Sequence, residues 1–115
     1  MARSQNKNKY RVFSNILVPL DGSNNAYKAL EYAVQLASRY DAKLTLLHVV
    51  EEPRYVIPEG ESFAVPKRIV EYGEKVLAVG KGIAEKSNIK TETELLRGNP
   101  AEQILNYANK DNVRV

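Results

Sequence analysis

Hydrophobic and polar residues form alternating blocks along this chain, and the blocks have two different periods. Short segments rich in apolar or β-branched residues lie at about residues 15–20, 43–50 and 91–96, and each precedes a longer segment with apolar residues every three or four positions. Short apolar runs are typical of buried strands, whereas the longer spacing is typical of helices that bury one side. The pattern predicts the order βαβαβα, which implies a parallel sheet with right-handed crossovers.

The expected helices cover about residues 24–40, 66–86 and 100–109. Ser23 and Asn99 each stand directly before a helix and can accept hydrogen bonds from its free N–H groups. The third strand alternates Thr with Glu, which predicts a less buried edge strand. The residues expected in the core from the last two helices are Ile69, Val70, Leu77, Ile83, Ala84, Ile104, Leu105 and Ala108.

Two features of the middle of the chain interrupt this regular pattern. The loop at about 51–65 is long for a compact domain, which predicts a flap near a site or an insertion. The second helix contains three glycines, and each lowers helix stability by about 1 kcal/mol relative to Ala when it is interior. These glycines are Gly73, Gly80 and Gly82.

The composition is that of one globular domain with one core. The chain has 115 residues, is 43% hydrophobic and has no cysteine, which excludes disulfides and thiolate catalysis. A single histidine excludes a His-rich metal site. No apolar run approaches the roughly 20 residues that span a bilayer, and the polar start is no secretory signal. We therefore expect a cytoplasmic protein without a membrane segment.

The net charge of +3 arises from the start of the chain. Four of the 17 basic residues precede Ser14 with no acidic residue among them, and the remaining 13 face 14 acidic residues. We expect a basic, flexible tail at residues 1–13 and a nearly neutral domain at residues 14–115. A basic face for nucleic acid on the domain itself is not indicated.

The strongest candidate site is the end of the first strand, where Pro19, Leu20 and Asp21 are followed by Gly22 and Ser23. In open α/β sheets, ligands bind beyond the carboxyl ends of the strands. An ionised carboxylate there can accept hydrogen bonds from amino or hydroxyl groups of a ligand. The alternative is that Asp21 only caps the following helix. We predict that its side chain lies beside a cleft.

Other residues point to binding or packing rather than to catalysis. His48 stands among apolar residues, which favours a packed or hydrogen-bonded core side chain. Neither a G-x-G-x-x-G fingerprint nor a phosphate-binding Walker loop is present. The turn at residues 98–100 can either attract an anion or simply cap its helix. No nucleophile–base pair is recognisable, so no enzymatic activity is expected.

Four stretches, taken together, resemble the universal stress protein family in order and spacing. They are residues 16–23, 29–33, 44–50 and 98–105, and the resemblance covers about residues 14–109. It implies a doubly wound three-layer α/β domain with strand order 3-2-1-4-5. Many members bind ATP at the switch point between strands one and four, and many dimerise through the last strand.

The resemblance also implies positions for a nucleotide. Carried over by position, Pro19, Leu20 and Asp21 line the adenosine side, and Val49 and Val50 flank the base. The family pattern continues with a loop G-x2-G-x9-G-[ST] after a fourth strand, and this sequence contains neither. We therefore expect strand order 3-2-1 with strands four and five missing, as in a C-terminally truncated member, and weak or undetectable ATP binding by residues 1–115.

The missing fourth strand has a second consequence. The first strand is left with an unpaired apolar edge, which predicts self-association as a homodimer or larger assembly. The leading interpretation is a nucleotide-associated regulatory domain. One alternative is a partner-binding or dimerisation module that uses the 51–65 loop. Another is a fragment of an adenine-nucleotide α-hydrolase-like enzyme, such as a nucleotidyl transferase.

Overall fold

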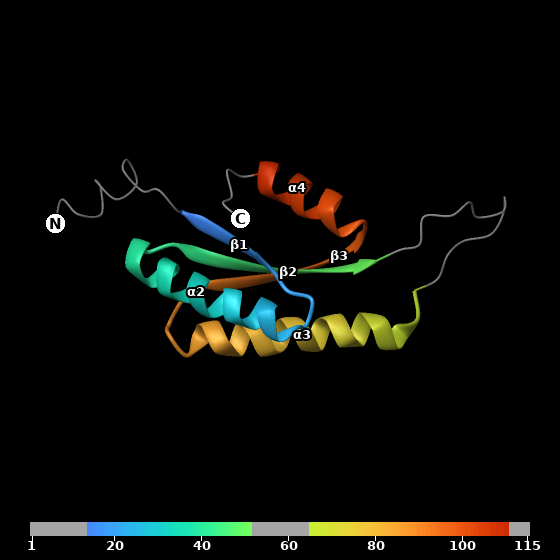
Figure 1. Cartoon of the computed structure of the whole chain (residues 1–115), viewed down its shortest axis with the longest axis horizontal. Helices are drawn as coiled ribbons and strands as arrows, with labels where there is room; N and C mark the ends of the chain where they lie inside the picture. The colour runs from blue at the N-terminus through green and yellow to red at the C-terminus, as the bar shows by residue number, and fades with distance from the viewer. Residues whose placement is uncertain (1–13, 52–64, 111–115) are drawn as a thin grey trace.

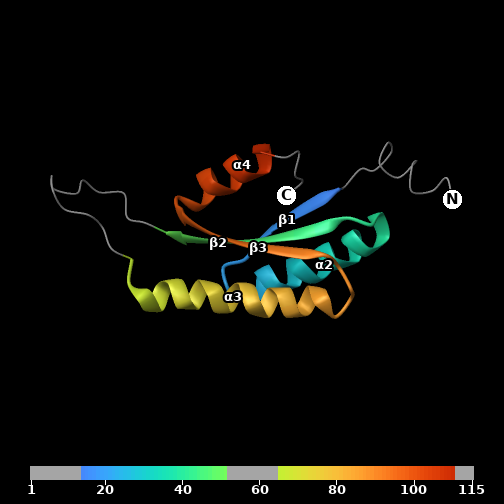
Figure 2. The same ribbon diagram turned by 180° about the vertical axis from the view of Figure 1, so that it is seen from behind.

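A parallel sheet lies between helices that cover both of its faces (Figures 1 and 2). The computed structural model describes residues 14–51 and 65–110. Their elements are β1 (Asn15–Pro19), α2 (Asn24–Tyr40), β2 (Lys43–Glu51), α3 (Lys67–Glu85), β3 (Thr91–Gly98) and α4 (Pro100–Lys110). The predicted order and the three-layer α/β/α class are confirmed. The expected basic tail and most of the 51–65 loop lie outside the described residues.

β2 is the central strand, and β1 and β3 run parallel to it on either side. β1 pairs with β2 from Asn15 opposite Lys43 to Pro19 opposite Leu47. Leu20 extends this ladder by one step, because its N–H donates to the Leu47 carbonyl oxygen at 2.7 Å. The spatial order β1-β2-β3 is the 3-2-1 arrangement that the family resemblance implies.

The backbone of β1 alternates between its two sides. The peptide groups of Ser14 and Leu20 bond to β2. Since successive residues of a strand turn their N–H and C=O groups to opposite sides, those of Asn15 and Leu17 face away from β2, as does the C=O of Pro19, which has no N–H. Within residues 14–51 and 65–110, no further strand pairs with this outer side of β1.

The two faces of the sheet bury different amounts of apolar surface. On the face covered by α2 and α3, the main cluster consists of Ile16, Val18, Leu20, Leu30, Ala33, Val34, Ala37, Ala42, Leu44, Leu46, Val76, Leu77 and Ala84. On the face covered by α4, the buried cluster is Leu17 and Leu47, with Val49, Leu96, Ile104, Tyr107 and Ala108 packed against it. Alternate side chains of each strand therefore serve different layers.

Two residues expected in the core are exposed. Leu105 is 61% exposed because α4 presents Ile104, Tyr107 and Ala108 to the sheet, and Leu105 lies about 100° further round the helix. Ile69 is 40% exposed in the first turn of α3, which reaches past the end of β2 (Figure 1). In both cases the helix lies where the sequence predicts it, but the sheet does not cover the side or the end of the helix that carries the residue.

The glycines of α3 are of two kinds. Gly80 is buried, and a Cβ atom there would lie 2.6 Å from Leu20 Cδ1 and 3.0 Å from Leu46 Cδ1. A Cβ atom at Gly82 would have nothing within 4 Å. Gly80 therefore lets α3 approach the sheet closely, which offsets its poor helix propensity, whereas Gly82 has no such packing role.

This contrast predicts opposite responses to the same substitution. Gly80→Val should lower the free energy of unfolding by about 1–3 kcal/mol, because the added carbons overpack a filled core. Gly82→Val should be neutral or stabilising by a few tenths of a kcal/mol, since Val is the better helix former. Urea denaturation of the two variants and the parent protein measures both effects, and equal losses of stability would contradict the packing role of Gly80.

Candidate functional site

Asp21 follows the carboxyl end of β1 in a turn that its own side chain helps to form. Its Oδ1 accepts a hydrogen bond from the Ser23 N–H at 2.9 Å. Ser23 in turn is the N-cap of α2, because its Oγ accepts from the Ala26 N–H at 3.1 Å. The capping function considered for Asp21 thus belongs to Ser23, and Asp21 orders the residue that makes the cap.

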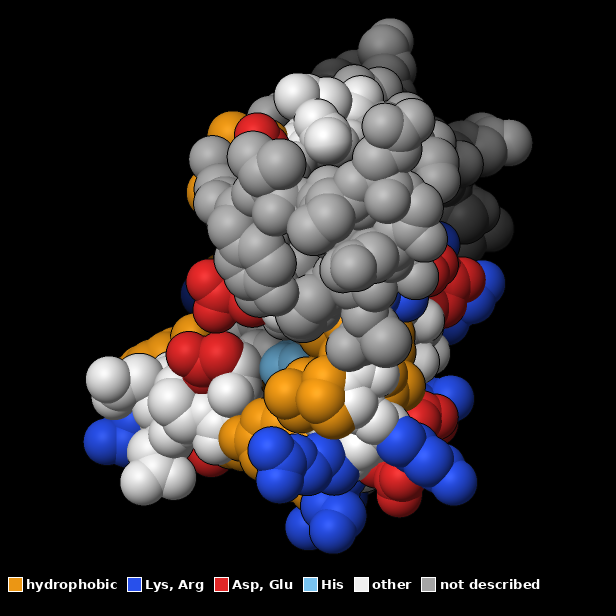
Figure 3. Space-filling view, turned by 90° about the vertical axis from the view of Figure 1, so that its right-hand side faces the viewer, with side chains coloured by type: hydrophobic (Ala, Val, Ile, Leu, Met, Phe, Trp, Pro, Cys, Tyr) orange, Lys and Arg blue, Asp and Glu red, His pale blue; other side chains and the backbone are white. Residues whose placement is uncertain are grey.

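Beside this turn lies an open pocket of about 540 Å³, a size typical of small-molecule sites. The ends of β1 and β2, with the residues that follow β1, contribute Pro19, Leu20, Asp21, Leu47, His48, Val49 and Glu51. The starts of α2 and α4 contribute Ser23, Asn25, Ala26, Pro100 and Ile104. Figure 3 views the molecule from this end, and the pale blue surface of its one histidine is visible there.

Four of the five residues expected to contact a ligand line this pocket. They are Pro19, Leu20, Asp21 and Val49, so the predicted cleft beside Asp21 is present. Val50 is not a lining residue and is only 1% exposed. Because side chains alternate along β2, Val50 points to the face opposite that of Val49.

The pocket also contains residues that the sequence did not single out for it. His48 was expected only as a packed side chain; it is 8% exposed, and its Nδ1 lies 2.8 Å from the Leu20 carbonyl oxygen. Glu51 adds a second carboxylate, and Ile104 adds an apolar wall from α4. Ile104 reaches the pocket because the parallel register brings α4 over the end of β2, and the sequence alone does not reveal this arrangement.

Two acidic side chains, Asp21 and Glu51, line the pocket, and the pKa of Asp21 is lowered. Hydrogen bonds from Ser23 hold the pKa of the Asp21 carboxyl below its ordinary value of 3.8, and the electrostatic influence of His48 acts in the same direction. Burial raises this pKa, but the hydrogen bonds from Ser23 lower it more. The carboxylate is therefore ionised at neutral pH and available as a hydrogen-bond acceptor.

In the turn between β3 and α4, Asn99 caps α4, because its Oδ1 accepts a hydrogen bond from the Glu102 N–H at 3.0 Å. This contact supports the capping interpretation of the turn at residues 98–100.

Among the residues that the structure describes, no cluster of three or more metal-binding side chains occurs. No helix in the same described ranges is long and apolar enough to cross a membrane.

Comparison with known proteins places these features in a family. The family model described as "Universal stress protein family" matches residues 13–115. Universal stress protein MJ0531 of Methanocaldococcus jannaschii is 31% identical over 106 residues, which are 90% of this chain and 62% of that protein. Universal stress protein YxiE of Bacillus subtilis is 32% identical over 111 residues, 89% of this chain and 75% of that protein.

Solved structures share the fold. A universal stress protein family member from Burkholderia pseudomallei has a TM-score of 0.70 at 24% identity, covering 90% of this chain and 82% of that one. A universal stress protein in complex with cAMP has a TM-score of 0.66 at 17% identity, covering 85% and 70%. An Arabidopsis thaliana family protein with AMP bound has a TM-score of 0.59 at 17% identity, covering 89% and 76%.

The chain thus spans less than two thirds of the length of the archaeal relative, and it contains the three strands and three helices described above. The family model extends over nearly the whole chain, and two curated relatives exceed 30% identity. This chain belongs to the universal stress protein family.

Proposed function

We propose that this chain is a regulatory domain whose pocket binds the adenosine part of an adenine nucleotide. The observation that carries the proposal is the ionised Asp21 carboxylate at the mouth of a pocket that also presents the apolar side chains of Val49 and Ile104. A carboxylate beside apolar walls suits a nucleoside, which offers amino and hydroxyl donors together with a flat ring. The structures of relatives with cAMP and AMP support the same ligand class.

Binding, rather than catalysis, is the proposed activity. The imidazole of His48 is 2.8 Å from a main-chain carbonyl oxygen, so its Nδ1 is already engaged. Asp21 and Glu51 are both acidic and disfavour a phosphate placed close to them. We therefore expect the adenosine part to provide most of the affinity, and ATP to bind weakly to residues 1–115.

The first test is the substitution Asp21→Asn, which keeps the shape of the side chain and removes its charge. Hydrogen bonds to charged groups contribute about 1.5–3 kcal/mol, so affinity for AMP and cAMP should fall roughly 10- to 100-fold. Isothermal titration of AMP, cAMP, adenosine and ATP at up to millimolar concentration measures the change.

Asp41→Asn is the matched control for that test. Asp41 lies at the other end of α2 in the left-handed region, with φ of 55°, which Asn also tolerates. This variant should bind like the parent protein. Absence of binding of all four ligands to the parent protein, or equal losses in the two variants, would overturn the proposal.

The lowered pKa of Asp21 gives a further prediction, for stability against pH. A carboxyl group whose folded-state pKa is depressed stabilises the fold above its unfolded-state pKa, and this contribution disappears as the pH falls through the folded-state pKa. The small stability difference between the parent protein and Asp21→Asn should be constant above about pH 5 and shrink below about pH 4. Urea denaturation at a series of pH values measures it, and a difference that grows on acidification would contradict the assignment.

We also propose that the chain self-associates through the side of the domain that carries β1. Among residues 14–51 and 65–110 no strand pairs with the outer peptide groups of β1, so a strand of a second copy can pair with them. Exposed apolar side chains of α2 lie on the same flank. Tyr27 marks the side of α2 that faces α3, because its hydroxyl donates to the Val76 carbonyl oxygen. Leu36 is exposed and lies about 180° around α2 from Tyr27, on the side away from α3. Tyr32, one turn before Leu36, extends this apolar flank.

Charge on that flank should oppose association. Tyr32→Lys combined with Leu36→Lys should shift the protein toward the monomer, because association would bring the two lysines of one copy close to the same lysines of the other. Light scattering at micromolar concentration measures the mass, and Val79→Lys on the exposed side of α3 is the control. A monomeric, cooperatively folded parent protein would refute the proposal.

A further inference from the structure

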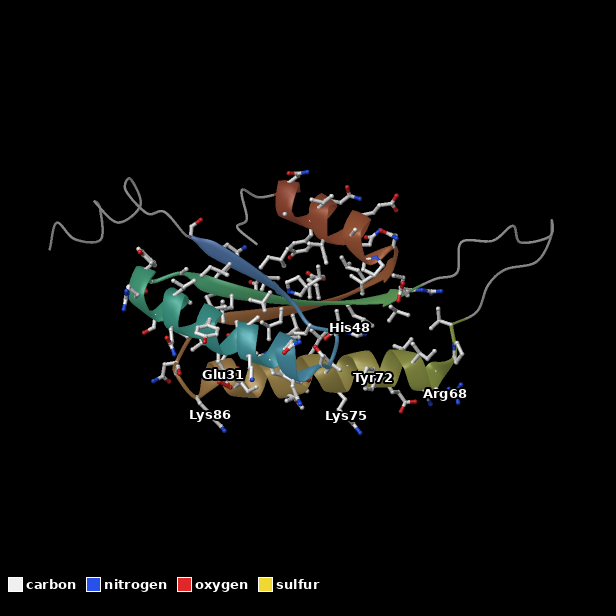
Figure 4. The ribbon with its side chains drawn as sticks, in the orientation of Figure 1. Glu31, His48, Arg68, Tyr72, Lys75 and Lys86 are labelled. Carbon is white, nitrogen blue, oxygen red and sulfur yellow. The ribbon has the colours of Figure 1, made fainter. Side chains whose placement is uncertain are left out.

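Two consecutive carbonyl groups of the turn after β1 are held by side chains from other elements. His48 of β2 approaches the Leu20 carbonyl oxygen at 2.8 Å through Nδ1. Tyr72 of α3 donates its hydroxyl to the Asp21 carbonyl oxygen at 3.5 Å, a longer and weaker contact. Figure 4 labels both side chains, which lie on the α3 side of the sheet. Their rings are 6.2 Å apart and packed edge to face.

A glycine of α3 makes the position of the imidazole possible. A Cβ atom at Gly73 would lie 2.6 Å from His48 Cδ2 and 3.0 Å from Nε2, so any other residue would push the ring out of place. With glycine there, the ring fills the space between β2 and α3 and is 8% exposed. A ring confined in this way holds its hydrogen bond without further loss of rotamer freedom.

Tyr72 closes the same turn from the side of α3. Gly22 has φ of +87°, and a Cβ atom at this position would collide with the Tyr72 hydroxyl. Gly22, in the left-handed region, therefore shapes the turn beside the Tyr72 ring. The carbonyl groups of Leu20 and Asp21 point toward donors on His48 and Tyr72. Asp21 lies inside this arrangement, and its carboxylate bonds forward to Ser23.

We infer that His48 and Tyr72 are positioning residues, which hold the Leu20–Asp21 backbone so that the Asp21 carboxylate faces the pocket. Neither needs to touch a ligand for this role. Because a carbonyl oxygen only accepts, Nδ1 of His48 carries the proton in the neutral ring and Nε2 does not. The consequence for ligand binding rests on the proposed function, whereas the geometry of the turn does not.

The first part of the test uses NMR on the ligand-free protein. Nitrogen-15 shifts of the imidazole should show the Nδ1–H form. The Ser23 amide, which donates to Asp21, should report the ionisation of that carboxyl group as the pH is lowered. His48→Leu and Tyr72→Phe should move the Ser23 amide resonance upfield and return the Asp21 midpoint toward 3.8. The effect should be larger in His48→Leu, which also removes the electrostatic influence of His48 on Asp21, so Tyr72→Phe isolates the loss of positioning.

Two variants separate positioning from a general loss of stability. His48→Asn retains a donor near the position of Nδ1 and should restore part of the parent signal. Tyr27→Phe removes a tyrosine hydroxyl that donates to a main-chain carbonyl at 3.3 Å, but that carbonyl belongs to Val76 on α3. It should leave the Ser23 amide and the Asp21 midpoint unchanged.

Adenine-nucleotide titration completes the experiment. His48→Leu and Tyr72→Phe should weaken binding by about three- to tenfold, the loss expected when one hydrogen bond no longer orders the site. An Nε2–H form of His48, or Ser23 and Asp21 signals that are unchanged or that change equally in Tyr27→Phe, would overturn the inference. If His48→Leu fails to fold, Tyr72→Phe against Tyr27→Phe decides. A parent protein that binds no nucleotide refutes the proposed function, while the ligand-free signals still judge the positioning.

Discussion

The parallel register between β1 and β2 is the constraint on which the rest of the structure depends. It sets Pro19 opposite Leu47, and Leu20 then bonds to the Leu47 carbonyl one step further. The next residue of β2 is His48, whose side chain comes to the same level as the Leu20 carbonyl. A shift by one residue would turn every side chain of β1 to the other face. Core, pocket and turn would be lost together.

Much of this arrangement follows from local sequence signals. The strand and helix positions and the caps at Ser23 and Asn99 were predicted, because each depends on residues close in the chain. The place of Asp21 beside a cleft was predicted from the rule that ligands bind beyond the carboxyl ends of strands in open α/β sheets. A short apolar run, a helical period and a capping residue are local physical preferences. They survive in the fold because packing does not oppose them here.

The residues that were placed wrongly, or whose packing was missed, depend on contacts between distant segments. The buried position of Val50 reflects the side-chain alternation of β2, which an unbroken apolar run does not reveal. Gly73 and Gly80 look like weak points of a helix until the sheet beneath them is known. Leu105 is apolar like a core residue, but α4 packs on the sheet with a neighbouring face of the helix. Distances across the fold decide such cases.

The proline at the end of β1 has a consequence for any strand that joins the sheet from outside. Its peptide nitrogen faces the outer side and carries no hydrogen, so the ladder along that side has its last donor at Leu17. An incoming strand would find N–H donors on β1 only at Asn15 and Leu17, while the carbonyl oxygen of Pro19 remains as an acceptor. The proline therefore removes one hydrogen bond from the pairing just below Asp21. A strand added on this side would be held less firmly where it approaches the mouth of the pocket.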